Sequence, residues 1–298
     1  MRKVLLGVLC LAVSSTVFAQ RVPAGRTWAQ PTVVEGMPLD ATALFHQYAT
    51  MPRAAVATEG PDDAFLFAVA GSTPAAGGTY FHSEVTLVNN KPNSSQYVLA
   101  IYFPSDNTLG CNNYVAKVLN LAANSFYTYR DFVDNPLSTR GLGSLVFIGV
   151  TSSGSVDSTA NIDGFSRIWT PVPGSAGTAS QSFPSVAISG YPGVQYIYGL
   201  HTESGFRSNV FIFNYNPNVT TARRFTLNIF GDNGASGAAT VDVQPCALGL
   251  YSIAGNYAGT GVAVTPPDSQ AGWFAFGSTV DQASSDNWSV AGRPDGIH

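Results

Sequence analysis

The chain of 298 residues has 14 basic and 18 acidic side chains, a formal net charge of −4, and charged residues make up only 11% of it. This balance excludes the strongly basic face that a nucleic-acid backbone requires, so no nucleic-acid partner is expected. The 30 glycines and 18 prolines interrupt the sequence too often for long helices. We therefore expect an all-β protein that is long enough for two domains.

Residues 1–19 are predicted to be a signal peptide. Two basic residues open the chain, residues 4–13 form a short apolar run, and small residues precede a cleavage point after Ala19. Cys10 suggests a lipidated leader, but Leu9 precedes it where that processing needs a small residue, so export without a lipid is preferred. No later run reaches the roughly 18 apolar residues of a transmembrane helix. The protein is therefore expected in the periplasm, at the cell surface or outside the cell.

Residues 20–63 are interpreted as an N-terminal extension, because prolines are scattered through them and little periodicity is visible. A short helix is predicted within this stretch. Asp40 is a suitable N-terminal cap for it, and Pro52 would stop it.

From residue 64 onward the apolar residues alternate with polar ones, which indicates β-strands. The alternation is clearest over 224–229, where Phe225, Leu227 and Ile229 are expected to face a core. The sequence Asp-Asn-Gly at 232–234 follows directly and is typical of a hairpin turn, because asparagine and glycine tolerate positive φ.

Four blocks of sequence recur in the same order, which predicts an internal duplication. The strongest match aligns FHSEVTLVNNKPN, from Phe81, with FRSNVFIFNYNPN, from Phe206. The next aligns Leu99 with Phe225 and places Asp106 and Asp232 in equivalent turns. The remaining two align SLVFIGV at 144–150 with GWFAFGS at 272–278, and IDGFS at 162–166 with SDNWS at 285–289.

We therefore predict two tandem, duplicated antiparallel β-sandwich domains of immunoglobulin-like size, preceded by the short N-terminal extension. The first domain is expected over 64–173 and the second over 195–298. Residues 174–194 are rich in Pro, Gly and Ser and are expected to connect the two, either as a free linker or as an extended segment laid along the second sandwich. Phe183, Val186 and Ile188 favour the extended segment, because a free linker gains nothing from apolar side chains.

The repeated block also resembles a known kind of sequence. Arg207-Ser208-Asn209-Val210 is similar to the repeat of uncharacterised exported bacterial proteins with tandem β-sandwich repeats, whereas His82-Ser83-Glu84-Val85 departs from it at the first position. The resemblance implies a sandwich fold and an exported protein, and it brings no known activity.

Two cysteines, Cys111 and Cys246, remain after the leader is removed, one in each predicted domain. Export exposes them to oxidising conditions, where a disulfide can form. Such a bond would join the two domains, and two unpaired thiols are the alternative.

No recognised catalytic motif is present. The sequence has no Gly-x-Ser-x-Gly, no HExxH and no CxxC. Of the four histidines, His82 and His201 lie within the predicted domains, and both are interpreted as strand-edge or surface residues. The protein is therefore not expected to be an enzyme, although a hydrolase without a recognisable motif is kept as an alternative.

Calcium is the only cofactor that the sequence suggests. Asp157, Asn161 and Asp163 lie in one predicted loop, and Asp281 and Asp286 lie in a loop taken as its counterpart. Loop oxygens are suitable Ca²⁺ ligands. The same residues are also ordinary turn formers, and that interpretation is favoured, with no cofactor at all.

Tyrosines gather at the start of the second predicted domain, at Tyr191, Tyr196 and Tyr198. They are the candidates for a ligand-binding surface, with a glycan or another surface protein as the partner. The predicted function is a non-catalytic exported protein with a structural or adhesive role. A carbohydrate-binding module is the alternative.

Overall fold

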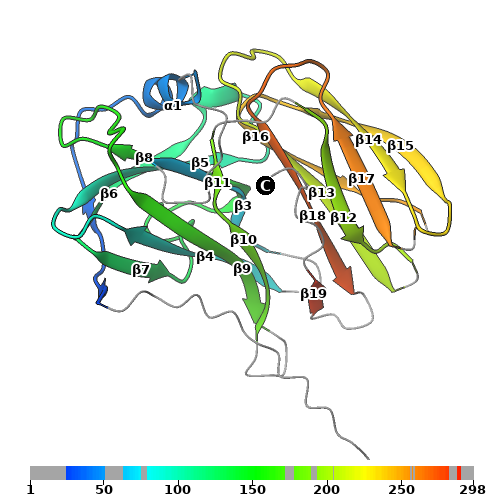
Figure 1. Cartoon of the computed structure of the whole chain (residues 1–298), viewed down its shortest axis with the longest axis horizontal. Helices are drawn as coiled ribbons and strands as arrows, with labels where there is room; N and C mark the ends of the chain where they lie inside the picture. The colour runs from blue at the N-terminus through cyan, green and yellow to red at the C-terminus, as the bar shows by residue number, and fades with distance from the viewer. Residues whose placement is uncertain are drawn as a thin grey trace, which may run out of the picture.

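The computed structural model describes residues 25–50, 63–74, 79–171, 178–188, 193–203, 205–255, 257, 259–281 and 287–289, and their regular secondary structure is mostly β-strand (Figure 1). The one α-helix among them is α1 (Ala41–Thr50). No helix in this part of the chain is long and apolar enough to cross a membrane. The predicted signal peptide, residues 1–19, lies outside the described residues.

The first half of the structure, residues 25–188, contains one sheet of eleven strands that folds over on itself. Strand β4 meets β3 only through the pairs Thr73–Phe81 and Pro74–Tyr80, so the sheet has two layers. The β4 layer has the order β1-β7-β4-β9-β10, and the β5 layer has the order β11-β3-β8-β5-β6-β2. The strands are β1 (Thr27–Trp28), β2 (Thr32–Val34), β3 (Ala64–Pro74), β4 (Tyr80–Asn89), β5 (Gln96–Pro104), β6 (Val115–Leu121), β7 (Ser125–Tyr129), β8 (Gly141–Val150), β9 (Ile162–Pro171), β10 (Thr178–Pro184) and β11 (Val186–Ala187).

The second half, residues 193–289, contains two sheets of four strands. The β14 layer has the order β12-β17-β14-β15, and the β13 layer has the order β16-β13-β18-β19. The strands are β12 (Gln195–Leu200), β13 (Phe206–Asn214), β14 (Arg223–Phe230), β15 (Ser236–Val243), β16 (Ala247–Ser252), β17 (Thr260–Thr265), β18 (Trp273–Asp281) and β19 (Asn287–Ser289).

The two halves follow the same strand order. Counted along the chain from β3 and from β12, the neighbours β3-β8-β5-β6 correspond to β12-β17-β14-β15. The neighbours β7-β4-β9-β10 correspond in the same way to β16-β13-β18-β19. The recurring block at Phe81 and Phe206 falls on corresponding strands, β4 and β13.

Three of the predicted residue equivalences are wrong in detail. By strand order, β8 is equivalent to β17 and β9 is equivalent to β18. The sequence matches at 272–278 and 285–289 instead assign β8 to β18 and β9 to β19, so each match is displaced by one strand. Leu99 and Phe225 also differ, because Leu99 packs in the core between the halves and Phe225 packs inside the second half. A one-residue slip turns a strand's side chains to the other face, which explains that error.

The alternation predicted for β14 is confirmed. Phe225, Leu227 and Ile229 are buried in the core of the second half, whereas Arg224 and Asn228 are exposed. The hairpin turn that follows has Gly234 at a φ of +79°, as expected for a turn glycine.

Besides the apolar core inside each half, a third apolar core joins the two halves. It brings the outer face of the β5 layer, with Ile101 and Phe103, against the outer face of the β13 layer, with Phe211 and Phe213. The ring centroids of Phe103 and Phe213 are 6.2 Å apart. Helix α1 covers one end of this core with Phe45, whose ring lies 5.2 Å from that of Phe103. The two halves therefore share a continuous apolar interface.

The N-terminal extension is more ordered than its sequence indicated. The predicted helix is present, and the Asp40 side chain accepts a hydrogen bond of 3.0 Å from the backbone N–H of Ala43 as its cap. Strands β1 and β2 were not expected. They pair with the outer edges of β7 and β6.

The predicted connector also contributes strands. Residues 178–184 form β10, which pairs with β9, and β11 pairs with β3, so this segment extends both layers of the first half. Phe183 of β10 reaches the second half, where its ring lies 5.0 Å from that of Phe276. A domain boundary at residue 174 would therefore separate β10 and β11 from the sheet they belong to.

Candidate functional site

The outer face of the β14 layer carries exposed aromatic side chains of the second half. Its strands lie side by side on the right of Figure 1. Tyr196 and Tyr198 stand on β12 with their side chains turned to solvent, at 39% and 41% exposure. Their rings lie in nearly parallel planes, 7° apart, with centroids separated by 6.1 Å. Two of the three tyrosines chosen from the sequence are therefore neighbours on an open surface.

Phe230 is a third member of this group and was missed in the sequence. It ends β14, is 39% exposed, and its ring contacts Tyr198 edge to face at 6.3 Å. Gly261 on the intervening strand β17 makes this contact possible, because a Cβ there would lie only 2.2 Å from the Phe230 ring. We call Tyr196, Tyr198 and Phe230 the aromatic strip.

A local irregularity lies beside Tyr198, at the end of β12. The pairing of β12 with β17 shifts register between Ile197 and Leu200, where Gly199 has a φ of +73°. Bulges of this kind bend a strand and redirect its side chains. The bulge therefore leaves Gly199 exposed and turns Leu200 inward, whereas Tyr196 and Tyr198 follow the regular alternation before it.

The remainder of this face is polar and electrically balanced. Arg224 donates two hydrogen bonds of 2.8 Å to the Asp242 carboxylate across β14 and β15. These bonds and the guanidinium charge hold the pKa of Asp242 below its ordinary value. Thr226 and Asn228 lie between this ion pair and the strip. A ligand on this surface would meet aromatic rings, hydroxyls and amides, with no excess charge.

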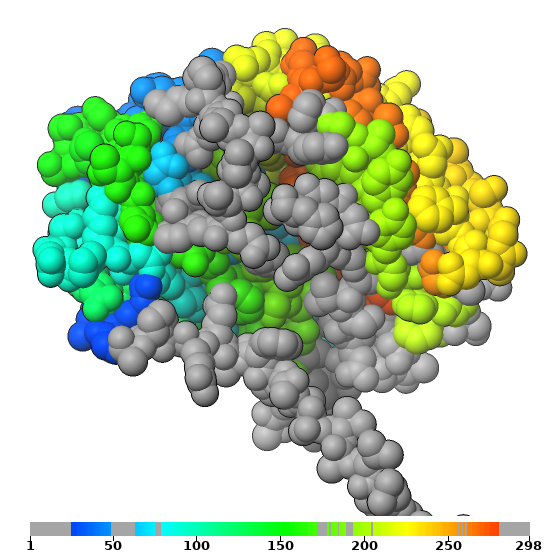
Figure 2. Space-filling view, viewed as in Figure 1, coloured from blue at the N-terminus to red at the C-terminus, as the bar shows by residue number. Residues whose placement is uncertain are grey.

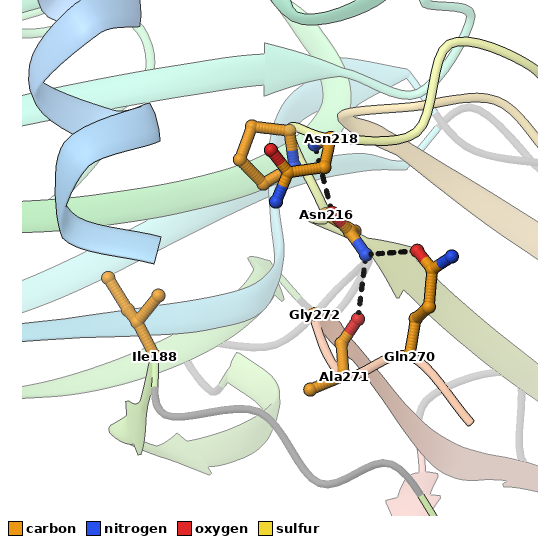
Figure 3. A pocket seen from close by; sticks show the side chains of 7 residues that line it. Ile188, Asn216, Asn218, Gln270, Ala271 and Gly272 are labelled. Atoms are coloured by element: carbon orange, nitrogen blue, oxygen red, sulfur yellow. Dashed lines mark hydrogen bonds between the residues drawn. The ribbon is translucent and has the colours of Figure 1, made fainter. Parts of the chain in front are cut away.

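Tyr191, the third predicted tyrosine, lies outside the described residues. The segment before it leads instead to a separate pocket, of about 430 Å³, shown in Figure 3. Ile188 forms one side of this pocket, and Asn216, Asn218 and Gln270 form the other.

The amide groups of this pocket are largely occupied by one another. The Asn216 side chain donates to the side-chain oxygen of Gln270 and to the carbonyl of Ala271, both at 3.1 Å. Its own oxygen accepts from the backbone N–H of Asn218 at 2.9 Å. These bonds join the loop after β13 to the loop before β18, so the pocket is primarily a junction between two loops.

The first set of predicted calcium ligands is spread over several local interactions. Asp157 accepts hydrogen bonds from the backbone and hydroxyl of Thr159, at 2.9 and 2.6 Å, and lies 3.5 Å from the ammonium of Lys91. Partial burial acts to raise its pKa, but these hydrogen bonds and the lysine charge outweigh burial and leave the pKa below its ordinary value. Asp163 instead accepts from its neighbour Gly164, at 2.6 Å. The backbone carbonyl and N–H of Asn161 are both hydrogen-bonded to the side-chain amide of Gln96.

Of the second set of predicted calcium ligands, only Asp281 lies in the described residues. Asp281 is the last residue of strand β18, and Asp286 lies outside the described residues. By strand order, the loop that corresponds to 151–161 is 266–272, before β18. Among the described residues, no group of three or more His, Cys, Asp or Glu side chains could hold a metal ion.

A serine, a histidine and an aspartate do meet in the first half. The Asp131 carboxylate accepts from Ser72 at 2.8 Å and lies 2.6 Å from Nδ1 of His82. A hydrolytic triad needs the histidine between the serine and the acid, where it can take the serine proton. Here the acid lies between the other two, and the His82 ring stacks on Trp169 at 4.6 Å. These contacts hold together the strand ends at which the three residues lie, and they do not place His82 to activate Ser72 for nucleophilic attack.

The polar residues of the repeated block have matching structural roles in both halves. The Ser83 hydroxyl binds both the N–H and the carbonyl of Gly71, and the Ser208 hydroxyl binds the same two groups of His201. Asn89 and Asn214 each end their strand, and each donates to the carbonyl of the last residue of a neighbouring strand and to that of the residue after it. The acceptors are Leu121 and Ala122 for Asn89, and Val243 and Gln244 for Asn214. The repeated serine and asparagine are therefore best explained by the fold.

The cysteines chosen from the sequence lie at the junction of the halves, where the structure joins Cys111 and Cys246 by a disulfide. The Asn107 side chain donates to the carbonyl of Cys246 at 2.9 Å, so a hydrogen bond crosses the junction beside it. Cys246 is fully buried.

Comparison with known proteins gives no relative from which a role could be transferred, since no protein family, curated protein or solved structure matches this chain. The aromatic strip is therefore judged by its own chemistry.

Proposed function

We propose that this protein is an exported, non-catalytic adhesive protein that binds a neutral glycan on the aromatic strip. The observation that carries the proposal is the gathering of Tyr196, Tyr198 and Phe230, each about 40% exposed, on one open sheet face. A contiguous exposed apolar surface bordered by polar residues often marks a binding site. The balanced charge of the surrounding face favours an uncharged partner.

Aromatic rings suit carbohydrate because they offer a flat apolar surface and few torsions to freeze. A sugar ring has an apolar face of C–H groups that packs on such a surface, and its hydroxyls then need polar neighbours. Thr226 and Asn228 supply a hydroxyl and an amide beside the strip, on the strand that Phe230 ends. The sheet beneath is rigid, so little ordering is required on binding.

The same proposal includes an origin by duplication, in which each half is a diverged antiparallel β-sandwich. The shared strand order and the matching bonds of Ser83 and Ser208 support it. The copies differ where their surroundings differ. Thr86 and Val88 lie on the open face of β4, whereas the aligned Phe211 and Phe213 of β13 are buried between the halves.

Export is part of this proposal and has a direct test. The mature N-terminus should be Gln20 in protein recovered from outside the cytoplasm, because residues 1–19 have the pattern of a cleaved leader. Edman degradation or intact-mass analysis would measure it. An uncleaved chain that remains in the cytoplasm would contradict the proposal.

Glycan binding is tested by a polysaccharide array followed by calorimetry on the best ligand. Tyr196→Ala and Phe230→Ala should each weaken binding by at least about tenfold, as for an aromatic anchor of an interface. Trp28→Ala is the control, because Trp28 is an aromatic residue of the first half with 64% exposure. Binding that the strip variants leave unchanged would refute the site, and turnover of ester, glycoside or peptide substrates would refute the non-catalytic role.

A further inference from the structure

The N-terminal segment covers two sheet edges in the first half of the molecule. Strand β2 pairs antiparallel with β6, and β1 pairs in parallel with β7. The segment is fixed by side chains as well, since Trp28 packs on Tyr127 with ring centroids 5.1 Å apart and Glu35 lies 3.1 Å from Lys117. The edges of β6 and β7 are thereby closed.

Among the described residues, the corresponding strands of the second half, β15 and β16, have open outer edges, since β15 pairs only with β14 and β16 only with β13. Strand β15 has eight residues and pairs without a register shift. It forms the outer rim of the molecule on the right of Figure 1, and the residues around it stand clear at the same rim in Figure 2.

The hairpin fixes which backbone groups of β15 face outward. Gly231 donates to the carbonyl of Ala235, which makes these two residues a hydrogen-bonded pair. Every second pair after it, beginning with Ile229–Gly237, is therefore hydrogen-bonded between β14 and β15. The alternate residues direct their N–H and C=O groups away from the sheet. These residues are Ser236, Ala238, Thr240 and Asp242.

The side chains of this edge leave it accessible to another strand. Residues 236–240 are Ser, Gly, Ala, Ala and Thr, which are small enough for close approach of a second backbone. Proteins usually protect such an edge with lysine, proline or a bulge. Strand β15 has none of these, and its one charge, on Asp242, is paired with Arg224 of its own sheet.

We propose that β15 pairs antiparallel with β15 of a second copy of this chain, so that the two β14 layers become one continuous sheet. A two-fold axis at Ala239 places Ala238 opposite Thr240 and Ser236 opposite Asp242, so no like charges face each other. An antiparallel pair of identical strands is closed and limits the assembly to a dimer.

The N-terminal segment of another copy is a poorer partner for the open edges of the second half. At the β16 edge, the pairs Leu87–Tyr127 and Ile212–Gly249 show that the ring on which Trp28 packs in the first half is replaced by a glycine. That segment is also already bound to β6 and β7 of its own chain.

The dimer would also make glycan binding bivalent, which is the one consequence that rests on the proposed function. An axis perpendicular to a continuous sheet turns the outer faces of both β14 layers the same way. The two aromatic strips would then face one surface, and linked sites can bind a polymer or a cell wall far more tightly than one site does.

The test is sedimentation velocity of the mature protein over a range of concentration, without glycan. The wild type should sediment at twice the chain mass. Ala238→Pro removes one outward N–H and no bond to β14, and Ala238→Lys with Thr240→Lys sets lysines opposite lysines. Both variants should be monomers with unchanged circular dichroism.

The matched control is Thr226→Lys with Asn228→Lys. These two residues of β14 pair with Thr240 and Ala238 of β15, so the control adds the same charges one strand away from the edge. It should remain a dimer. A wild type that is monomeric at about 100 μM, or a dimer that survives both edge variants, would overturn the proposal. Because glycan is absent, either result is independent of the aromatic strip, and monomeric Ala238→Pro should still bind glycan with one site.

Discussion

Tyr102 has a buried hydroxyl for which no hydrogen-bond partner exists among the described residues. Burial, with a smaller effect of the Asp106 charge, raises the pKa of this phenol. A buried polar group without a partner costs free energy, so removing it should not destabilise the fold. Tyr102→Phe should therefore leave the free energy of unfolding unchanged or raise it by up to about 1 kcal/mol, as measured by urea denaturation.

Ser83 provides the opposite case for the same measurement. Its buried hydroxyl binds both backbone groups of Gly71, at 2.6 and 2.9 Å, and Ser83→Ala would leave both without that partner. The loss should be about 1–3 kcal/mol. Equal effects of Tyr102→Phe and Ser83→Ala would contradict this account of the two hydroxyls.

Asp157 is expected to make stability depend on acid pH. Its pKa is lowered in the folded protein, so its contribution is fully present above the ordinary carboxyl pKa and disappears as the pH falls through the folded value. The difference in melting temperature between wild type and Asp157→Asn should stay constant from pH 7 to about 4. Below that pH the difference should fall toward zero. Lys91→Met should narrow the same difference, because it removes the nearby positive charge. A difference that widens in acid would show that the carboxylate is not favoured by folding.

At the scale of one strand, β14 offers a sharp contrast between neighbouring positions. Phe225 is fully buried in the core of the second half, and Thr226 is on the open face. Phe225→Asp would bury an unpaired charge and should cost several kcal/mol, about 3 or more. Thr226→Asp should cost less than about 0.5 kcal/mol. Denaturant midpoints measure both, and similar losses would mean that the strand faces the other way.

This strand was predictable because its pattern is local. Alternation over 224–229, the turn at 232–234 and the cap at Asp40 each depend on residues close in sequence, and each is present in the structure. Strands β1 and β2 were not predicted, and the segment of β10 and β11 was expected to lie along the second sandwich, whereas it pairs with β9 and β3 of the first half. All four strands are held by pairing with the edges of distant strands. Segments of two or three residues, such as β1, β2 and β11, carry no periodicity of their own.

The candidate site was predictable only in part, for a similar reason. Tyr196 and Tyr198 alternate with Ile197, so their outward direction follows from the strand pattern. Phe230 joins them only because Gly261, thirty-one positions further along the chain, lies beneath its ring. A single sequence does not show which distant glycine will be the neighbour.

On the scale of the whole molecule, the halves are joined by two different means. One is the apolar core in which Phe103 meets Phe213 and helix α1 packs, and the other is the disulfide between Cys111 and Cys246. Apolar packing stabilises the joined state directly. A cross-link acts mainly on the unfolded chain, by reducing its entropy in proportion to the logarithm of the loop length.

Removing the disulfide should therefore destabilise the protein without separating its halves. The bond spans 135 positions, and a loop of that length corresponds to about 5 kcal/mol at most in the chain-entropy treatment. Cys111→Ala with Cys246→Ala should lower the free energy of unfolding by an amount up to that limit, and the denaturant midpoint should fall accordingly. Small-angle scattering should give an unchanged radius of gyration, because the core around Phe103 and Phe213 remains.

Reductant should shift the wild-type midpoint toward that of the variant and leave the variant unaffected. Two free thiols found by alkylation and mass spectrometry in protein never exposed to reductant would show that the bond is absent, and a swollen variant would show that the apolar core alone does not hold the halves together.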